Sequence, residues 1–359
     1  MRVVALAALV LAAGMLGATS APAAHAQSTC ESTGFAGMTA AVVNPTHPVS
    51  GTVDAAGCDI GVFYGHGHHG TIIGAHISGA TAFGVVVAGA NVTISKSSVT
   101  NIPGARGGGD EGGCEEEGEE GDTGGCSGGG GSEGAGEGGE FGYIGSRHGT
   151  GILVTDGGKS TITGDYVASY GRRGISVSGP GAMATITGNT ITGSGPNSGT
   201  GMQMGQSGVW IANGGMAVIS YNTISNNLIV GSGPASNAIM VAGGSAHNGQ
   251  PNYTTGIQIS GNVLRNNVIG VLLSNLPVPS TPTSNRVDGN TITLSVTVPP
   301  GPGESSEPGE AGMKRPAGVM DAGGNSDKIN GNYISGYGQR SIVISEQCIN
   351  VVAHGNTIR

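Results

Sequence analysis

Charged and aromatic side chains cluster beside two strand-like segments, residues 151–154 and 174–177. They are Arg147, His148, Asp156, Lys159, Tyr170, Arg172 and Arg173. Removal of a proton next to a carboxylate requires a base such as lysine and a cation that stabilises the developing enolate. This set of residues therefore predicts catalytic roles for Lys159 and Arg172 and binding roles for the other five. The opposing interpretation, that all seven are solvated turn residues, stays open.

A recurring asparagine motif indicates the elements that would position this cluster. The motif Asn-x-(Ile/Val/Leu), usually after glycine, has its asparagines at Asn189, Asn222, Asn262, Asn290, Asn332 and Asn356. Asparagine tolerates left-handed backbone, and its amide can bond neighbouring main chain, so it suits a tight corner between two strands. Repeats of this length, built from short β patterns, predict an all-β solenoid in which each repeat is one coil.

The pattern of three short strands per repeat resembles the right-handed parallel β-helix of the pectin-lyase-like superfamily. The resemblance covers residues 58–359 and implies roughly nine coils with long loops. It also implies that the six asparagines form an inward ladder between the second and third strands, with Asp165 and Ser97 as imperfect rungs. Enzymes of this superfamily place charged residues on or beside the first sheet to bind and deprotonate sugars. The fold alone does not fix the activity.

Stacked coils lie about 4.8 Å apart, so this fold would gather the charged cluster into one basic pocket with one carboxylate. Side chains alternate across a strand, which identifies the outward residue of each first strand. These residues are Val86, Leu153, Ser176, Trp210, Met240, Leu272, Met320 and Val343. Asp321 would face inward two residues after Val319, so we expect the strand to end before it.

Seven of these eight outward residues are apolar, and an exposed apolar stripe needs a cover. Loops of the same chain, a binding groove and a subunit interface are the alternatives. Trp210 is the only tryptophan of the chain. It is assigned a binding role, either as a stacking surface for a sugar or as an anchor for a protein.

Composition limits the class of protein. Glycine accounts for 72 of the 359 residues, whereas aromatic residues make up only 4% and charged residues 10%. The net charge of −9 comes mainly from residues 104–142, which hold 11 acids and one base. The rest of the chain has 12 acids and 13 bases, so it has no overall charge that would favour nucleic acid.

The N-terminus reads as a secretory signal. Arg2 precedes an apolar stretch at residues 3–17, and Ala24-His25-Ala26 forms a cleavage site made of mostly small residues. We therefore assign residues 1–26 to a signal peptide, 27–57 to an N-terminal cap and 58–359 to the solenoid. Residues 104–142 and 297–317 are low-complexity loops. The mature chain is expected to be secreted, extracellular or at the cell surface, with no membrane span.

Five cysteines are expected in an oxidising compartment. Cys30 and Cys58 are expected to tie the N-terminal segment together, and Cys114 to close the acidic loop onto Cys126. Cys348 is then left over, either buried or available to another chain. Spacing alone does not fix these pairings, and none of the cysteines has the spacing of a zinc site.

Three hypotheses for function follow. The first is a β-helix that presents its first sheet and loops to an extracellular polysaccharide or envelope protein without performing chemistry. The second is a carbohydrate-active enzyme, a polysaccharide lyase or epimerase, that uses the cluster between Arg147 and Arg173. The third is a structural surface protein whose apolar stripe is buried in a homo-oligomer. None of the three calls for a metal or a cofactor.

Overall fold

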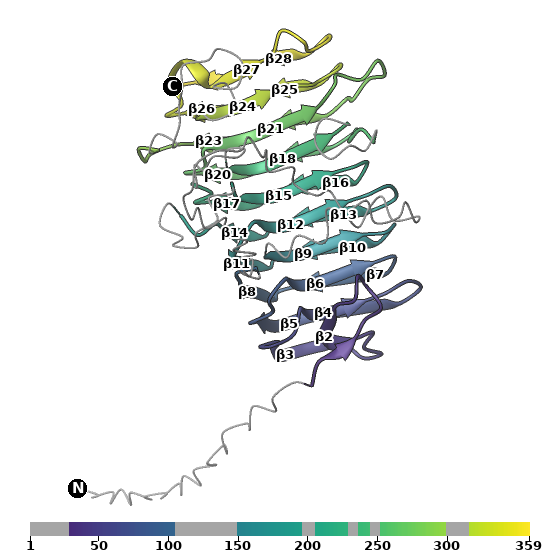
Figure 1. Cartoon of the computed structure of the whole chain (residues 1–359). Coiled ribbons are helices and arrows are strands. Elements are labelled where there is room, and N and C mark those ends of the chain that lie inside the picture. Colours follow the sequence, from purple (N-terminus) through teal and green to yellow (C-terminus); the bar gives the residue numbers. More distant parts are fainter. Residues whose placement is uncertain (1–28, 105–148, 196–204, 229–235, 245–251, 299–315) are drawn as a thin grey trace, which may run out of the picture.

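The computed structural model describes residues 29–104, 149–195, 205–228, 236–244, 252–298 and 316–359. These residues form a stack of coils whose strands run along two long sheets (Figure 1). Sheet A holds the first strand of each coil, and sheet B holds the second and third strands. The predicted all-β parallel solenoid is therefore confirmed.

The strands of sheet A are β1 (Glu31–Ser32), β2 (Thr39–Val43), β4 (Ile60–Tyr64), β6 (Phe83–Ala88), β9 (Thr150–Thr155), β12 (Arg173–Ser178), β15 (Ser207–Ala212), β18 (Asn237–Gly243), β21 (Ile269–Asn275), β24 (Ala317–Asp321) and β27 (Ile342–Ile344). All of them pair in parallel except β1, which is antiparallel to β2. The stacked coils thus begin at β2, within the segment assigned to a cap.

The second strands of the coils, in sheet B, are β3 (Val49–Asp54), β5 (His69–Ser78), β7 (Asn91–Ser95), β10 (Lys159–Thr163), β13 (Met183–Thr187), β16 (Met216–Ser220), β19 (Gln258–Ser260), β22 (Arg286–Asp288), β25 (Lys328–Asn330) and β28 (Val352–His354). The third strands are β8 (Ser98–Ile102), β11 (Tyr166–Tyr170), β14 (Thr190–Thr192), β17 (Thr223–Ser225), β20 (Val263–Arg265), β23 (Thr291–Thr293), β26 (Tyr333–Ser335) and β29 (Thr357–Ile358). A 3₁₀ turn, η2 (Gly338–Arg340), precedes β27.

Strict register between coils produces a narrow apolar core. Ile152 pairs with Ile175, Ile175 with Val209, and Val209 with Ile239. These side chains are fully buried in one continuous cluster that runs the length of the stack. A one-residue slip would turn every inward side chain outward, so burial of this column fixes the register.

The predicted asparagine ladder lies at the corner between the second and third strands. Each backbone N–H donates to the side chain of the next residue along the series Ala75, Ser97, Asp165, Asn189, Asn222, Asn262, Asn290, Asn332 and Asn356. Asn222 Nδ2 also donates to Ile186 O of the preceding coil at 2.9 Å. The ladder thereby pairs the buried backbone N–H groups of this corner with side-chain acceptors.

A second, shorter ladder lies at the corner where the third strand leads back to sheet A. Asn227 Nδ2 donates to Asn267 Oδ1 at 2.9 Å, and Tyr170 OH donates to Asn227 Oδ1 at 2.7 Å. Tyr337 OH donates to Asn267 O at 2.9 Å. This ladder was not predicted, although Asn227 and Asn267 both follow a ladder asparagine by five residues.

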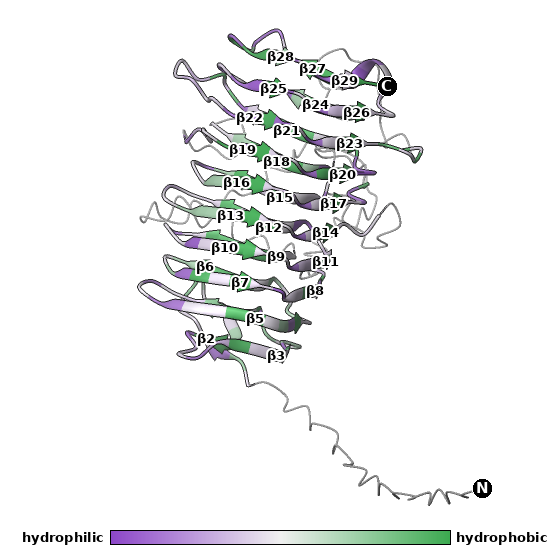
Figure 2. Ribbon diagram, turned by 180° about the vertical axis from the view of Figure 1, so that it is seen from behind, coloured by the Kyte–Doolittle hydropathy of each residue, from purple (hydrophilic) through white to green (hydrophobic). Residues whose placement is uncertain are grey.

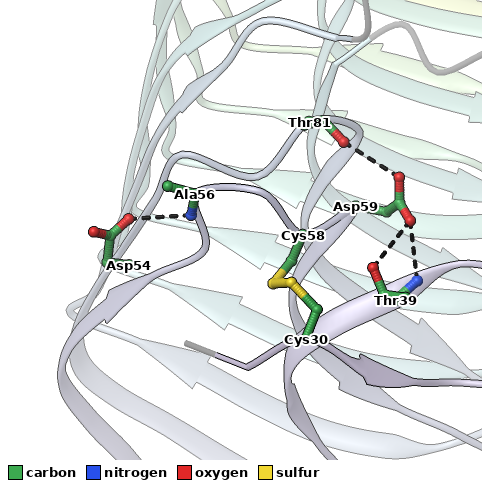
Figure 3. Close-up of a disulfide and its surroundings, with 7 residues drawn as sticks. All are labelled: Cys30, Thr39, Asp54, Ala56, Cys58, Asp59 and Thr81. Atoms are coloured by element: carbon green, nitrogen blue, oxygen red, sulfur yellow. Dashed lines mark hydrogen bonds between the residues drawn. A yellow bond between two sulfur atoms is a disulfide. The ribbon is translucent and has the colours of Figure 1, made fainter. Parts of the chain in front are cut away.

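The first coil is fastened by the predicted disulfide between Cys30 and Cys58, whose Cα atoms lie 5.5 Å apart (Figure 3). Beside it, Asp59 Oδ2 accepts hydrogen bonds from Thr39 N at 3.0 Å and Thr39 Oγ1 at 3.1 Å. The second predicted pair, Cys114 and Cys126, lies outside the described residues. Residues 1–26 of the predicted signal also lie outside them.

The outward residues of sheet A form one row, as predicted. Ser176 pairs with Trp210, Trp210 with Met240, and Met240 with Leu272. Loop residues of the same chain cover part of this row, because Leu228, Val268 and Val298 pack in one cluster with Met240, Leu272 and Met320. The stripe is therefore covered by loops of the same chain at Met240, Leu272 and Met320, which is one of the three alternatives.

The expectation that the strand ends before Asp321 was wrong. Asp321 is the last residue of β24, pairs with Leu273 and Ile344, and is fully buried. Its carboxylate faces inward as the alternation dictates, next to polar groups of the following turn. Among the described residues, no helix has the length and apolar character needed to cross a membrane.

Candidate functional site

Two arginines and the single tryptophan meet on the outer side of sheet A. Trp210 lies in the middle of β15, Arg173 opens β12 in the preceding coil, and Arg172 comes just before it. The Cζ atom of Arg173 lies 3.6 Å from the centroid of the Trp210 ring, and that of Arg172 lies 5.4 Å away. We call these three residues the arginine–tryptophan site.

The local sequence explains why Arg173 can reach the ring. A Cβ on Gly174 would lie 2.5 Å from Gly208 O and 2.7 Å from Ile191 Cγ2, so only glycine fits the close approach of the coils there. Arg173 pairs with Ser207 of the next coil, three residues before Trp210. The guanidinium group can therefore lie over the neighbouring indole.

The electrostatic character of the site is cationic and aromatic. A guanidinium within about 6 Å of an indole centroid is attracted by the ring quadrupole. Both arginines meet this limit, and Trp210 remains partly exposed. The site therefore holds two positive charges beside an accessible ring, an arrangement suited to a ligand with both a carboxylate and an apolar face.

The neighbours of Trp210 in the row differ in polarity. Met240 follows it on one side, and Ser176 precedes it on the other. Ser176 is fully buried, and its hydroxyl has no hydrogen-bond partner among the described residues. An unpaired buried hydroxyl costs free energy, so Ser176 contributes no accessible polar group to the row beside Trp210.

The prediction that Lys159 and Arg172 share a pocket was wrong. Arg172 N donates to Gly149 O at 2.9 Å, just before β9 begins, whereas Asp156 and Lys159 follow the end of β9. The six residues of β9 separate the two turns by about 20 Å at 3.3 Å per residue. In a parallel sheet, the residues that precede the strands lie together at the N-terminal ends of the strands, and the residues that follow them lie together at the C-terminal ends.

The binding role predicted for Tyr170 was also wrong, because its ring is buried and its hydroxyl belongs to the second ladder. Desolvation raises the pKa of this phenol well above its usual range, so Tyr170 is neutral. Arg147 and His148 lie outside the described residues. Of the predicted cluster, the structure brings together Arg172 and Arg173. They lie beside Trp210, whose binding role was predicted separately.

A buried acidic group near the C-terminal end was missed by the sequence analysis. Asp327 accepts hydrogen bonds from Thr283 Oγ1 and, at 2.7 Å, from Asn285 N. Cys348 Sγ lies 3.4 Å from Asp321 Oδ1. Desolvation raises the pKa of Asp321 to about 6, and the charge of Asp327 adds to this effect. These residues lie inside the coils, away from the arginine–tryptophan site.

Comparison with known proteins supports the fold. A family model described as a right-handed β-helix region matches residues 143–301. The chain is a right-handed parallel β-helix. The predicted likeness to the pectin-lyase-like superfamily therefore holds at the level of the fold. No curated protein matches the sequence of this β-helix.

Three solved structures are similar to this β-helix. DFA-IIIase from Arthrobacter chlorophenolicus A6 without its lid is 12% identical, with a TM-score of 0.38, and the match covers 91% of this chain and 72% of that one. The A-module of the Azotobacter vinelandii mannuronan C-5 epimerase AlgE6 is 13% identical, with a TM-score of 0.35 and coverage of 88% and 75%. A mutant of the periplasmic alginate epimerase AlgG is 10% identical, with a TM-score of 0.34 and coverage of 83% and 62%. The identities are low, and each of these TM-scores lies below 0.5.

Proposed function

We propose that this β-helix is an exported, carbohydrate-active protein that binds an acidic polysaccharide at the arginine–tryptophan site. One observation carries the proposal, namely the two guanidinium groups within cation–π distance of a partly exposed indole on the outer side of sheet A. Planar guanidinium groups suit carboxylates, and the exposed part of the indole offers apolar surface to a sugar ring. The Cys30–Cys58 disulfide supports export, because such bonds persist in oxidising compartments.

The chemistry that this recognition would serve is proton removal next to the carboxylate of a uronate, as in a lyase or an epimerase. Arg173 opens β12 and so lies on the first sheet, where the superfamily carries charged residues. A guanidinium there would neutralise the carboxylate and stabilise the enolate. Asp156 and Lys159 lie at the opposite end of β9, so neither takes this proton, and the role proposed for the site is limited to binding and neutralising the carboxylate.

A non-catalytic binding protein is the second candidate. It is favoured by the outward row of sheet A, in which Ser176, Trp210 and Met240 offer no group that titrates near neutral pH. Binding and turnover are therefore measured separately. The same polysaccharides serve for both assays.

The test measures binding of polygalacturonate and alginate to the wild type, with neutral dextran as the control polymer. Arg173→Gln and Arg172→Gln should each weaken binding of the acidic polymers, whereas Arg286→Gln on sheet B should not. Turnover is followed by the absorbance of unsaturated uronate and by NMR of the epimerised product. Binding without turnover would select the second candidate, and equal binding by wild type and Arg173→Gln would refute the assignment of the site.

A further inference from the structure

A groove on the outer face of sheet B is separate from the arginine–tryptophan site. It has a volume of about 420 Å³. Its lining comes mainly from β7, β10, β13 and β16, the second strands of successive coils, which stack on one another in Figure 2. Its lining residues are Asn91, Lys159, Ser160, Thr161, Met183, Ala184, Thr185, Met216, Ala217, Val218 and Gly256. None of these residues carries a negative charge.

The groove runs along the coil axis between two columns of outward side chains. Asn91, Lys159, Met183 and Met216 pair in register and form one wall. Thr161, Thr185 and Val218 form the other wall. The columns are two residues apart along each strand, which is about 7 Å.

Polarity changes steadily from one end of the groove to the other. The lining from β7 and β10 is polar throughout and includes the ammonium group of Lys159. The lining from β13 is mixed, because Met183 stands opposite Thr185. The lining from β16 is apolar throughout, and the groove ends at Gly256, which has no side chain.

The apolar part of the groove is exposed to an unusual degree for a solvated sheet. Met183 is 39% exposed, Met216 42% and Val218 39%. They adjoin one another across β13 and β16, so they form one patch rather than scattered single residues. Contiguous exposed apolar surface beside a fixed charge is typical of a ligand groove.

We propose that this groove binds a single-chain anionic amphiphile, such as a fatty-acid carboxylate. The acid group lies at Lys159 and Asn91, and the alkyl chain extends over Met183 and Met216 towards Gly256. The three strand-to-strand steps from Lys159 to Gly256 give the tail about 14 Å. Methionine side chains adapt their shape to such a tail.

The geometry favours this occupant over two others. The two columns of outward side chains are about 7 Å apart from centre to centre, so a single alkyl chain covers the strip along them, whereas the paired chains of a phospholipid extend beyond it. A sugar chain would carry hydroxyl groups past Met216 and Val218, which offer them no polar partner, so its desolvation would oppose binding. The proposal does not depend on the proposed function, because it concerns another sheet and another ligand.

The experiment titrates the protein with dodecanoate below its micelle concentration and follows the ¹³C-labelled methyl signals of methionine by NMR. Met183→Leu and Met216→Leu assign the two signals of the groove among the ten methionines of the chain. We expect these two signals to shift and octanoate, which has four methylenes fewer than dodecanoate, to bind at least about tenfold more weakly, because each buried methylene contributes hydrophobic free energy. Dodecyltrimethylammonium, with the same tail and the opposite charge, should bind more weakly than dodecanoate.

Lys159→Gln should weaken dodecanoate about fivefold, which is the scale of an exposed charge pair. Lys328→Gln removes an exposed lysine elsewhere on sheet B and should have no effect. A Met216→Thr, Val218→Thr double variant should abolish the dependence on tail length. Equal affinity for the two head groups, an unchanged affinity in Lys159→Gln, or shifts confined to other methionines would each overturn the proposal.

Discussion

The guanidinium of Arg173 lies 3.6 Å from the ring centroid of Trp210, across the boundary between two adjacent coils. Because Trp210 is the only tryptophan of the chain, its fluorescence reports on this contact without interference. We expect acidic polysaccharide to shift the emission of the wild type and neutral dextran to leave it unchanged. Arg173→Lys keeps the charge but loses the planar group, so it should retain only part of the response. An identical response in the wild type and Arg173→Gln would contradict this prediction.

Asp165 is the one ladder rung in the described residues that has a carboxylate. The rung before it, Ser97, has a hydroxyl, and the rung after it, Asn189, has an amide. Its Oδ1 accepts from Ser97 N at 2.7 Å, whereas its buried Oδ2 has no partner among the described residues. Asn189, the next rung, donates from Nδ2 to Ile162 O of the preceding coil. An ionised Asp165 has no N–H group, so it cannot make the equivalent bond to its own preceding coil. Desolvation accordingly raises the pKa of Asp165 to about 6.

This shift has a definite sign for stability. Between its unfolded pKa near 3.9 and its folded pKa, Asp165 binds more protons in the folded state, so the free energy of unfolding falls as pH rises through this range. Asp165→Asn should raise the stability at pH 8 by on the order of 2–3 kcal/mol and weaken this pH dependence. Urea unfolding at pH 4 and pH 8 measures both effects. The prediction fails if the variant is no more stable than wild type at pH 8.

The ladder itself should carry a measurable part of the stability. The amide of Asn262 is fully buried, donates to Ile219 O at 2.9 Å and accepts from Asn222 N at 2.9 Å. Asn262→Ala leaves these partners unsatisfied, so we expect a loss of about 2–4 kcal/mol. Asn91→Ala removes an exposed asparagine of sheet B and serves as the matched control. Equal losses in the two variants would show that the ladder contributes nothing particular.

The sequence predicted a residue's place correctly where that residue's position recurs in every repeat. Asn262 could be placed in the ladder because its neighbours in space are its counterparts in the repeat, and the same holds for the row that contains Trp210. The prediction of the catalytic pair was wrong because it ignored which end of a strand each residue flanks. Lys159 and Arg172 both flank first strands, but they lie at opposite ends of them.

Tyr170 and Asp321 illustrate a second limit. A tyrosine before a strand and an aspartate at its end look like surface residues, because burial of either requires specific partners. Those partners, Asn227 for Tyr170 and the polar groups around Cys348 for Asp321, come from coils that are distant in sequence. The alternation of side chains along the strand correctly predicted that Asp321 points inward. Because carboxylates are usually solvated, we expected the strand to end before Asp321, and that expectation was wrong.

The disulfide should stabilise the first coils measurably. It closes a loop with a sequence separation of 28 residues, for which chain entropy predicts about 3–4 kcal/mol. A Cys30→Ser, Cys58→Ser double variant should therefore unfold at lower urea concentration and expose β2 and β4 to hydrogen exchange before the C-terminal coils. Uniform loss of protection along the whole stack would contradict a local role for this bond.

Cys348 should react slowly with alkylating reagents in the folded protein. Desolvation and the nearby charge of Asp321 raise the pKa of its thiol to about 12, so little thiolate exists at pH 8. Asp321 is itself ionised at pH 8, because its own pKa is about 6. Asp321→Asn removes the charge, lowers the thiol pKa and should accelerate alkylation by iodoacetamide at that pH.

The control for this prediction is the unfolded protein, in which wild type and Asp321→Asn should react at the same rate. Asp321→Asn keeps a group that can accept from Cys348 Sγ, so faster reaction in the folded state would come from the lost charge rather than from a lost contact. Hydrogen exchange of β27 separates this effect from fraying of the last coil. Faster alkylation together with lost protection of β27 would attribute the change to opening and contradict the electrostatic explanation.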